Sequence, residues 1–246
     1  MVFLGFVFGT WLSVRRAARA GVASETILDL IMWILFSSIA GARLTYVLTH
    51  LDEFQGRWLD VISPIQSDGT IGIAGLVLLG GVAAAIPVSV WFLKRKRVPV
   101  MQALDILIPA LAFGIAIGRV GCLLNGCCFG VPTKLPWGLV FPDTCLAGMT
   151  YAHQSIHPTQ LYAIIYSSAI GLFLLWRTPR KAFEGELFAL FLALYGVARF
   201  LNETVRYYRE GMILLRFGSF ELTLSMMISA LLFGVGLALL IRNRKP

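Results

Sequence analysis

Long runs of apolar residues, separated by short polar segments, dominate the pattern along the chain. A helix needs roughly twenty mostly apolar residues to cross the hydrocarbon core of a bilayer. Six segments meet this requirement: residues 27–48, 70–93, 99–118, 160–176, 185–202 and 220–241. The pattern therefore predicts six transmembrane helices.

The N-terminal run from Met1 to Val14 predicts a seventh, shorter helix. At about 1.5 Å per residue it reaches only about 21 Å into a core of roughly 30 Å. A secretory signal peptide carries its positive charges before the apolar run, whereas Arg15, Arg16 and Arg19 follow this one. We therefore interpret the run as a retained first helix.

Composition supports a membrane protein. Of the 246 residues, 58% are hydrophobic and 14% are charged, with a mean hydropathy of +0.79, far from the balance of a soluble domain. The chain shows no internal repeat and no soluble segment. We predict an all-α polytopic membrane protein with about seven transmembrane helices and one domain over residues 1–246.

Basic residues predict the orientation of these helices. Most of the 21 Lys and Arg lie in four clusters: Arg15, Arg16, Arg19; Lys94, Arg95, Lys96, Arg97; Arg177, Arg180, Lys181; and Arg242, Arg244, Lys245. Each cluster follows an odd-numbered predicted helix, so the positive-inside rule places the N-terminus outside and the C-terminus in the cytoplasm. Four tryptophans fall near the same boundary, as in an interfacial belt: Trp11, Trp33, Trp91 and Trp176. Short basic clusters that flank apolar helices do not indicate nucleic-acid binding, despite the net charge of +8.

Three arginines fall inside or at the ends of predicted helices: Arg43, Arg119 and Arg199. A charged side chain in a membrane helix costs roughly 2.5–3.5 kcal/mol, so it indicates a functional site by default. All three lie toward the outer face in the predicted topology. A guanidinium fork matches a phosphate, which favours a lipid headgroup transferase or a lipid transporter.

The sixth predicted helix, at residues 185–202 when the N-terminal run is counted as the first, carries a polar ladder. Tyr195, Arg199 and Glu203 are spaced four residues apart and share one helix face, with Arg206 close to the same line. The alternative is that Arg199 and Glu203 merely neutralise each other within the helix.

Two other polar segments have both functional and structural interpretations. GRVGCLLNGCCFG at residues 118–130 lacks the residues of a phosphate loop, so its glycines indicate a turn, a close ligand approach or close helix packing. His157, before Pro158, could act as a base near neutral pH or could cap the helix that follows.

Several motifs, in order over nearly the whole chain, resemble the prolipoprotein diacylglyceryl transferase family. The matching segments are GARLTYVL at 41–48, Gly80 with Gly81, Asp105, GRVGCLLNG at 118–126, PWGLVFP at 136–142, HPTQLY at 157–162 and YGVARFLNETVR at 195–206. The resemblance implies a bacterial inner-membrane enzyme that moves diacylglycerol from phosphatidylglycerol to the lipobox cysteine of a preprolipoprotein. We expect neither a cofactor nor a metal for this reaction.

Matching positions imply roles for individual residues. Arg119 corresponds to the signature arginine that holds the phosphatidylglycerol headgroup, and Asn125 and Gly130 complete that motif. Arg199 corresponds to a second essential arginine, with Tyr195 beside it. Further substrate-binding residues implied by position are Glu203, Arg206, Arg43, Tyr46, Gly80 and Gly81. The implied chemistry is attack of the substrate thiol on a glycerol carbon, which releases glycerol phosphate.

The chain also departs from the family pattern. Leu79 stands where the family has a histidine before the Gly-Gly pair; Cys122, Cys127 and Ala163 replace an asparagine and two glutamates. The paired cysteines resemble a GCCYG-type branch of the family. Without the histidine, the substrate thiol could ionise beside the arginines, or His157 could act as the base.

Two alternative functions remain open at this stage. Cys122, Cys127, Cys128 and His157 could bind a metal or carry redox chemistry, since thiolates and imidazole suit zinc. The chain could also be a phospholipid-binding or transport protein that has lost the chemistry. The four cysteines allow three disulfide connectivities, and the sequence does not choose among them.

Overall fold

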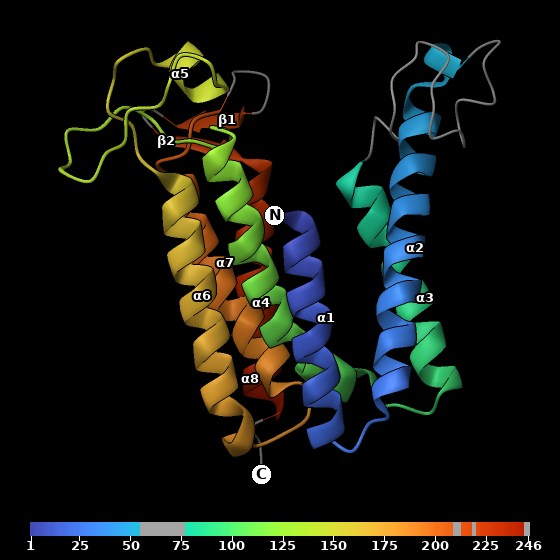
Figure 1. The fold of residues 1–246 in the computed structure, drawn as a ribbon. Coiled ribbons are helices and arrows are strands. Elements are labelled where there is room, and N and C mark those ends of the chain that lie inside the picture. The colour runs from blue at the N-terminus through green and yellow to red at the C-terminus, as the bar shows by residue number, and fades with distance from the viewer. Residues whose placement is uncertain (55–76, 209–212, 218–219, 244–246) are drawn as a thin grey trace. The chain divides into compact units, whose positions relative to one another are not determined.

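The computed structural model describes residues 1–54, 77–208, 213–217 and 220–243 (Figure 1). Its long elements are α1 (Val2–Arg19), α2 (Ser24–Thr49), α3 (Leu78–Arg95), α4 (Val100–Leu124), α6 (Thr159–Arg177), α7 (Glu186–Glu203) and α8 (Leu224–Asn243). Short elements are η1 (Leu51–Phe54), α5 (Leu146–Thr150), η3 (Thr178–Arg180), β1 (Ile213–Phe217) and β2 (Phe220–Thr223). The predicted all-α class is confirmed.

The long apolar runs form the long helices, as their pattern predicts. Among the described residues, four helical stretches are long and apolar enough to span a membrane: Ser24–Thr49, Val100–Leu124, Thr159–Arg180 and Leu224–Asn243. Helix α8 buries only Met226, Ser229 and Gly236 and leaves large apolar side chains exposed, as a lipid-facing helix does. The chain is thus a polytopic membrane protein. Residues 70–76 of the predicted third helix, and most of the predicted loop 49–69, lie outside the described residues.

The first helix is longer than predicted. It continues past Val14 to Arg19, so its 18 residues span about 27 Å. The residues that extend it are the arginines and alanines of RRAAR, which are strong helix formers. The prediction stopped at the first charge, but charge ends an apolar run without ending a helix.

The last predicted helix begins too early. Residues 220–223 form β2, which pairs antiparallel with β1, a strand that lies between the predicted helices 185–202 and 220–241 (Figure 1). Helix α8 begins only after Thr223, whose Oγ1 accepts a hydrogen bond from the Met226 N–H at 3.3 Å. That bond satisfies one of the free N–H groups of the first turn, as N-cap residues do.

The fourth helix is also longer than predicted, and this changes the setting of Arg119. Helix α4 continues past residue 118 to Leu124, so Arg119 and Cys122 project from a helix and do not lie in a loop. Gly118 and Gly121 are therefore helical, and the chain turns only afterwards, at Gly126.

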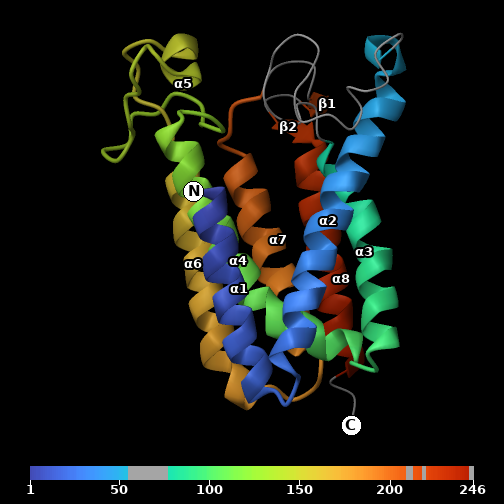
Figure 2. The ribbon, with the colours of Figure 1, turned by 45° about the vertical axis from the view of Figure 1, so that its right-hand side comes forward.

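The chain divides into two compact units. One, here the bundle unit, comprises residues 1–13 and 104–246; the other, the hairpin unit, comprises residues 14–103. In the hairpin unit α2 packs along α3 (Figure 2), and the backbones approach so closely at Gly41 and Gly80 that neither position has room for a Cβ.

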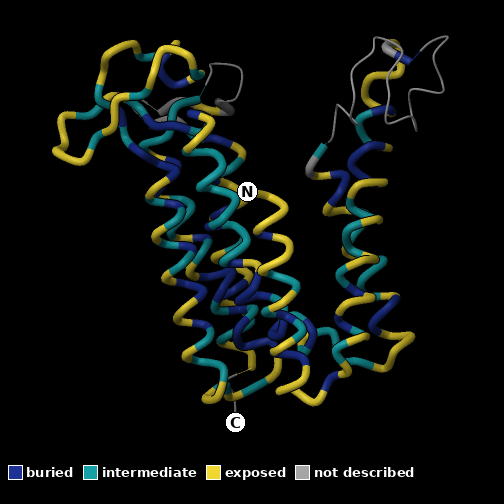
Figure 3. The backbone as a smooth tube through the Cα atoms, viewed as in Figure 1, coloured by how far each residue is buried: buried dark blue, intermediate teal, exposed yellow. Residues whose placement is uncertain are grey.

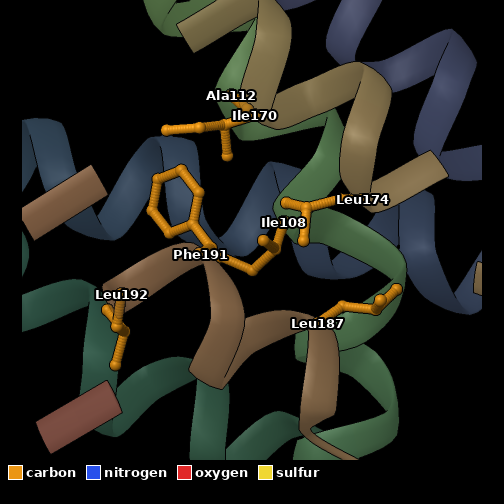
Figure 4. Packing of buried hydrophobic residues seen from close by; sticks show 7 residues of the cluster. All are labelled: Ile108, Ala112, Ile170, Leu174, Leu187, Phe191 and Leu192. Atoms are coloured by element: carbon orange, nitrogen blue, oxygen red, sulfur yellow. The ribbon is translucent and has the colours of Figure 1, made fainter. Parts of the chain in front are cut away.

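In the bundle unit α7 packs against α6 and α8, and Figure 3 shows buried positions concentrated on the inner faces of these helices. Apolar side chains from α4, α6 and α7 form its core (Figure 4): Ile108, Ala112, Ile170, Leu174, Leu187, Phe191 and Leu192. The start of α1 joins this unit, because the Phe8 ring lies 5.8 Å edge-on from the ring of Phe113.

Asp105 joins the first turn of α7 to α4 within the bundle unit. The buried carboxylate accepts hydrogen bonds from the backbone N–H groups of Gly185 (2.9 Å) and Phe188 (3.1 Å), and it pairs with Lys181 Nζ at 3.1 Å. It is therefore both an ion-pair partner and an anion at a helix N-terminus.

We expect Asp105→Asn to lower the free energy of unfolding by about 1–3 kcal/mol, because the amide loses the ion pair and one acceptor. Thermal unfolding in detergent measures the change. Asp143→Asn, a change at an exposed loop carboxylate, is the matched control. Equal stability of the two variants would contradict the role given to Asp105.

Candidate functional site

Three basic and hydroxyl side chains converge on one carboxylate at the end of α7. Glu203 is buried; its Oε1 pairs with Arg199 Nη2 and lies 3.0 Å from Arg206 Nη1, and its Oε2 accepts a hydrogen bond from Tyr208. Arg199 also donates to Ser225 Oγ on α8 at 3.2 Å. The predicted ladder on α7 is thus real, and the Arg199–Glu203 pair expected as an alternative is present within it.

Arg119 brings a third guanidinium to this cluster from α4. It interacts electrostatically with Arg206, with Tyr195 and with the Cys128 thiol. Arg199 and Arg206 pair with Glu203, and Arg119 adds a third guanidinium beside Arg206, so the cluster carries a net positive charge of two. Arg206 Nε has no hydrogen-bond partner among the described residues, so one buried donor remains available for an anion.

Tyr166, which is not among the predicted site residues, also belongs to this cluster. Its ring packs against that of Tyr195 at 5.9 Å, and it interacts electrostatically with Arg199 and Arg119. Its place could have been predicted from the sequence, because Tyr162 and Tyr166 are four residues apart and therefore share one face of α6.

Helix α4 ends in a Schellman motif just before the paired cysteines. The Cys127 N–H bonds to the Cys122 carbonyl at 3.1 Å, and the Gly126 N–H bonds to the Leu123 carbonyl at 3.2 Å, the pairing typical of this motif. Gly126 has a φ of 61°, which glycine adopts readily. Asn125 is an exposed residue at the helix end.

The turn brings three thiols together. The Sγ atoms of Cys122, Cys127 and Cys128 all lie within 4.8 Å of one another. Cys145 lies outside this group and donates to the Pro142 carbonyl at 3.2 Å. All four thiols are free.

The environment separates the two adjacent thiols chemically. Burial and the neighbouring thiols raise the pKa of Cys127 to about 11. Burial also acts to raise the pKa of Cys128, but the guanidinium groups of Arg206 and Arg119 outweigh it, so the pKa of Cys128 is lowered. Cys128 is therefore the more readily ionised of the pair.

Backbone pairing holds the loop after the cysteines against the ends of α6 and α7. The Gly130 N–H donates to the His157 carbonyl at 3.0 Å, and Gly130 forms a bridge with Arg206. A Cβ at Gly130 would lie 2.6 Å from the Val205 carbonyl oxygen. Gly130 thus allows the loop to approach closely, which places Arg206 beside the cysteine turn.

His157 lies just before α6 and does not join the thiols. Its Nδ1 lies 3.2 Å from the hydroxyl of Tyr162, which accepts a hydrogen bond from Trp137 Nε1 at 2.8 Å. Burial lowers the pKa of His157, so the imidazole is neutral at pH 7 and can accept a proton. The four-ligand set of three cysteines and His157 is therefore not assembled in this structure.

The remaining predicted residues lie in the hairpin unit. Arg43 is buried on α2, with its guanidinium carbon 5.7 Å from the ring centre of Tyr46 and 5.1 Å from that of Phe54. Gly80 and Gly81 pack against α2, and Leu79 is 61% exposed. Within the hairpin unit, the structure thus brings Arg43 and Tyr46 together.

Comparison with known proteins covers almost the whole chain. A family model described as prolipoprotein diacylglyceryl transferase matches residues 1–242. A phosphatidylglycerol-prolipoprotein diacylglyceryl transferase of Nitratidesulfovibrio vulgaris strain Miyazaki F is 34% identical over 248 residues, which cover 99% of this chain and 88% of the relative. Proteins of the same description from Finegoldia magna and Thermosynechococcus vestitus are 32% and 35% identical, over 84% of this chain and 77% and 75% of their own lengths.

Proposed function

The chain belongs to the prolipoprotein diacylglyceryl transferase family, and from this premise we propose that it transfers diacylglycerol from phosphatidylglycerol to the lipobox cysteine of a preprolipoprotein. The observation that carries the proposal is the excess positive charge at the end of α7, where Arg199 and Arg206 share the carboxylate of Glu203 and Arg119 lies beside Arg206. A phosphodiester matches this charge and the forked donors of arginine.

The same charge suits the chemistry of the transfer. The substrate sulfur attacks a glycerol carbon, the bond from that carbon to the phosphate oxygen breaks, and the electron pair leaves with glycerol phosphate. Arg119 and Arg199 stabilise the negative charge that develops on the leaving phosphate. The headgroup site is lined or shaped by Tyr195, Asn125 and Gly130. Glu203 and Arg206 fix the orientation of the headgroup in this site.

Residues of the hairpin unit are proposed to bind the lipid as well. Arg43 offers a buried cation beside Tyr46, and Gly80 and Gly81 let α3 pack closely against the helix that carries these residues. We place the reaction at the outer face of the bacterial inner membrane, with about seven helices crossing it, the N-terminus outside and the basic clusters in the cytoplasm.

Complementation tests the proposal directly. We expect the wild-type chain to restore growth and lipoprotein modification in a bacterial strain depleted of its own transferase. Modification is read as the mass gain of a reporter lipoprotein. A chain that is expressed and inserted but leaves the reporter unmodified would instead indicate a phospholipid-binding homologue without transferase chemistry.

His157 is the proposed general base, since Leu79 cannot take a proton. We expect His157→Ala to lower kcat by about 100-fold, the lower end of the usual contribution of a general base. Because burial lowers the pKa of His157, wild-type activity should fall only as the pH drops below the ordinary histidine value of about 6.5. Full activity of His157→Ala, measured with phosphatidylglycerol and a lipobox peptide, would exclude this role; the exposed His153→Ala is the control.

A further inference from the structure

The three clustered thiols are not explained by phospholipid binding. Around one ion with metal–sulfur bonds of about 2.3 Å, three sulfurs lie about 4 Å apart. The Sγ atoms of Cys122, Cys127 and Cys128, all within 4.8 Å of one another, are already close to that spacing. The cluster has the size of a three-thiolate metal site.

Backbone strain supports a functional reason for this spacing. Cys128 has a φ of 60°, a conformation that costs a residue with a side chain about 1–2 kcal/mol. Together with the turn at Gly126, it directs two adjacent thiols back toward Cys122 on α4. Such strain persists where the surrounding structure enforces it, and it is concentrated at functional sites.

The first turn of α6 holds the cysteine backbone in place. Thr159 Oγ1 donates to the Cys128 carbonyl at 2.6 Å, and Gln160 Nε2 donates to the Cys127 carbonyl at 2.7 Å. Both donors are buried. Hydrogen bonds of this kind, one shell outside the ligands, orient them before the metal arrives.

The charges around the cluster also fit a bound ion. Three thiolates and one divalent ion carry a net charge of minus one, which the neighbouring guanidinium of Arg119 offsets. Soft thiolates select zinc and Cu(I) over hard cations. No other described cysteine, histidine or carboxylate joins the three thiols, so a tetrahedral ion would keep one position open, as catalytic zinc sites do.

We propose that Cys122, Cys127 and Cys128 bind one zinc ion, and that its open position takes the thiol of the lipobox cysteine. This second part rests on the proposed function. A zinc-bound thiol is deprotonated: the sulfur–zinc bond forms and the thiol proton passes to His157, the proposed general base. The sulfur electron pair then forms the bond to the glycerol carbon, and glycerol phosphate leaves with the electrons of the broken carbon–oxygen bond. Zinc would thus supply thiol activation in a chain that has Leu79 in place of the family histidine.

Metal titration of the full-length chain tests the site. The protein is purified in detergent under reducing, metal-free conditions and titrated with Co²⁺ as a spectroscopic substitute for Zn²⁺. We expect one equivalent to bind with sulfur-to-metal charge-transfer absorption, and Zn²⁺ to displace it. Cys122→Ser, Cys127→Ser and Cys128→Ser should each weaken metal binding by more than the roughly 10- to 100-fold loss that follows when a residue hydrogen-bonded to a metal ligand is replaced.

Cys145→Ser is the matched control, because Cys145 lies outside the cluster, and it should bind metal as the wild type does. X-ray absorption of the zinc-loaded wild type counts the sulfur ligands without any variant. Fewer than three sulfurs, no bound metal in the reduced protein, or equal binding by all four serine variants would overturn the site.

A lipobox peptide tests the open position. Addition of the peptide to the Co²⁺-loaded protein should increase the sulfur-to-metal absorption, and the same peptide with serine for cysteine should leave it unchanged. An unchanged spectrum with both peptides would overturn the thiol step.

Failure of the proposed function gives a different result: the wild type would bind metal and still not modify the reporter. Full reporter modification by the Cys122→Ser, Cys127→Ser and Cys128→Ser variants would instead retain the transferase and reject the metal.

Discussion

Replacement of Arg119 by alanine is expected to abolish modification of a reporter lipoprotein and to lower kcat/KM by about 1,000-fold. Removal of one positioned charge from an electrostatic site typically costs 100- to 1,000-fold. We expect the upper end of this range for Arg119 because it lies near Cys128 and Tyr195 and near no described carboxylate. Its charge is therefore not already neutralised. The measurement is transfer from phosphatidylglycerol to a lipobox peptide in detergent.

Two further variants identify the reason for the loss. Arg119→Lys keeps the charge and removes the fork, so it should recover only part of the activity if the phosphate is held by paired donors. Arg180→Ala removes an exposed guanidinium that stacks 4.8 Å from the ring centre of Trp176, at the opposite end of α6 from His157, and it should retain activity. If Arg119→Ala keeps wild-type kcat/KM, Arg119 does not bind the headgroup.

Glu203→Ala is expected to have the largest effect on stability, a loss of about 3–5 kcal/mol in the free energy of unfolding. The carboxylate is fully buried and pairs with Arg199 and Arg206. Its removal leaves two buried cations without an anionic partner, which costs several kcal/mol. The thermal unfolding midpoint in detergent should fall, and activity should fall with it because both guanidinium groups lose their fixed position.

Controls for Glu203 separate charge from side-chain volume. Glu203→Gln keeps the shape and removes the charge, so a similar loss would identify the ion pairs as the cause. The exposed Glu184→Ala should leave the midpoint unchanged. The double variant Glu203→Ala/Arg206→Ala should be less unstable than additivity predicts, since one of the stranded cations is gone. Strict additivity would mean that the Arg206–Glu203 pair contributes nothing.

Local patterns along the chain were sufficient to predict the helices and one face of the site. Apolar runs of membrane-spanning length predict helices whatever their neighbours are, because backbone groups in a bilayer must bond within the segment. The spacing of Tyr195, Arg199 and Glu203 likewise predicts a shared face, since residues four apart meet on any α-helix. Both predictions depend on local geometry alone, and both agree with the structure.

Errors at the ends of elements have a common cause. Helix α1 extends through its arginines and α4 extends past Arg119, because charged residues interrupt an apolar pattern without interrupting backbone hydrogen bonding. Residues 220–223 continue the apolar pattern of α8 but pair with β1. Hydrophobicity does not distinguish a short strand from the first turn of a helix.

The sequence alone determined the membrane class, the long helices and the family resemblance, because each depends on composition, period or ordered motifs. Tertiary structure decided which charges meet. Arg119 on α4 reaches Arg206 beyond α7, and Cys122 meets Cys127 and Cys128 only through a turn with positive φ at Gly126 and Cys128. Neither contact follows a helical or strand period, so no pattern along the chain could reveal it.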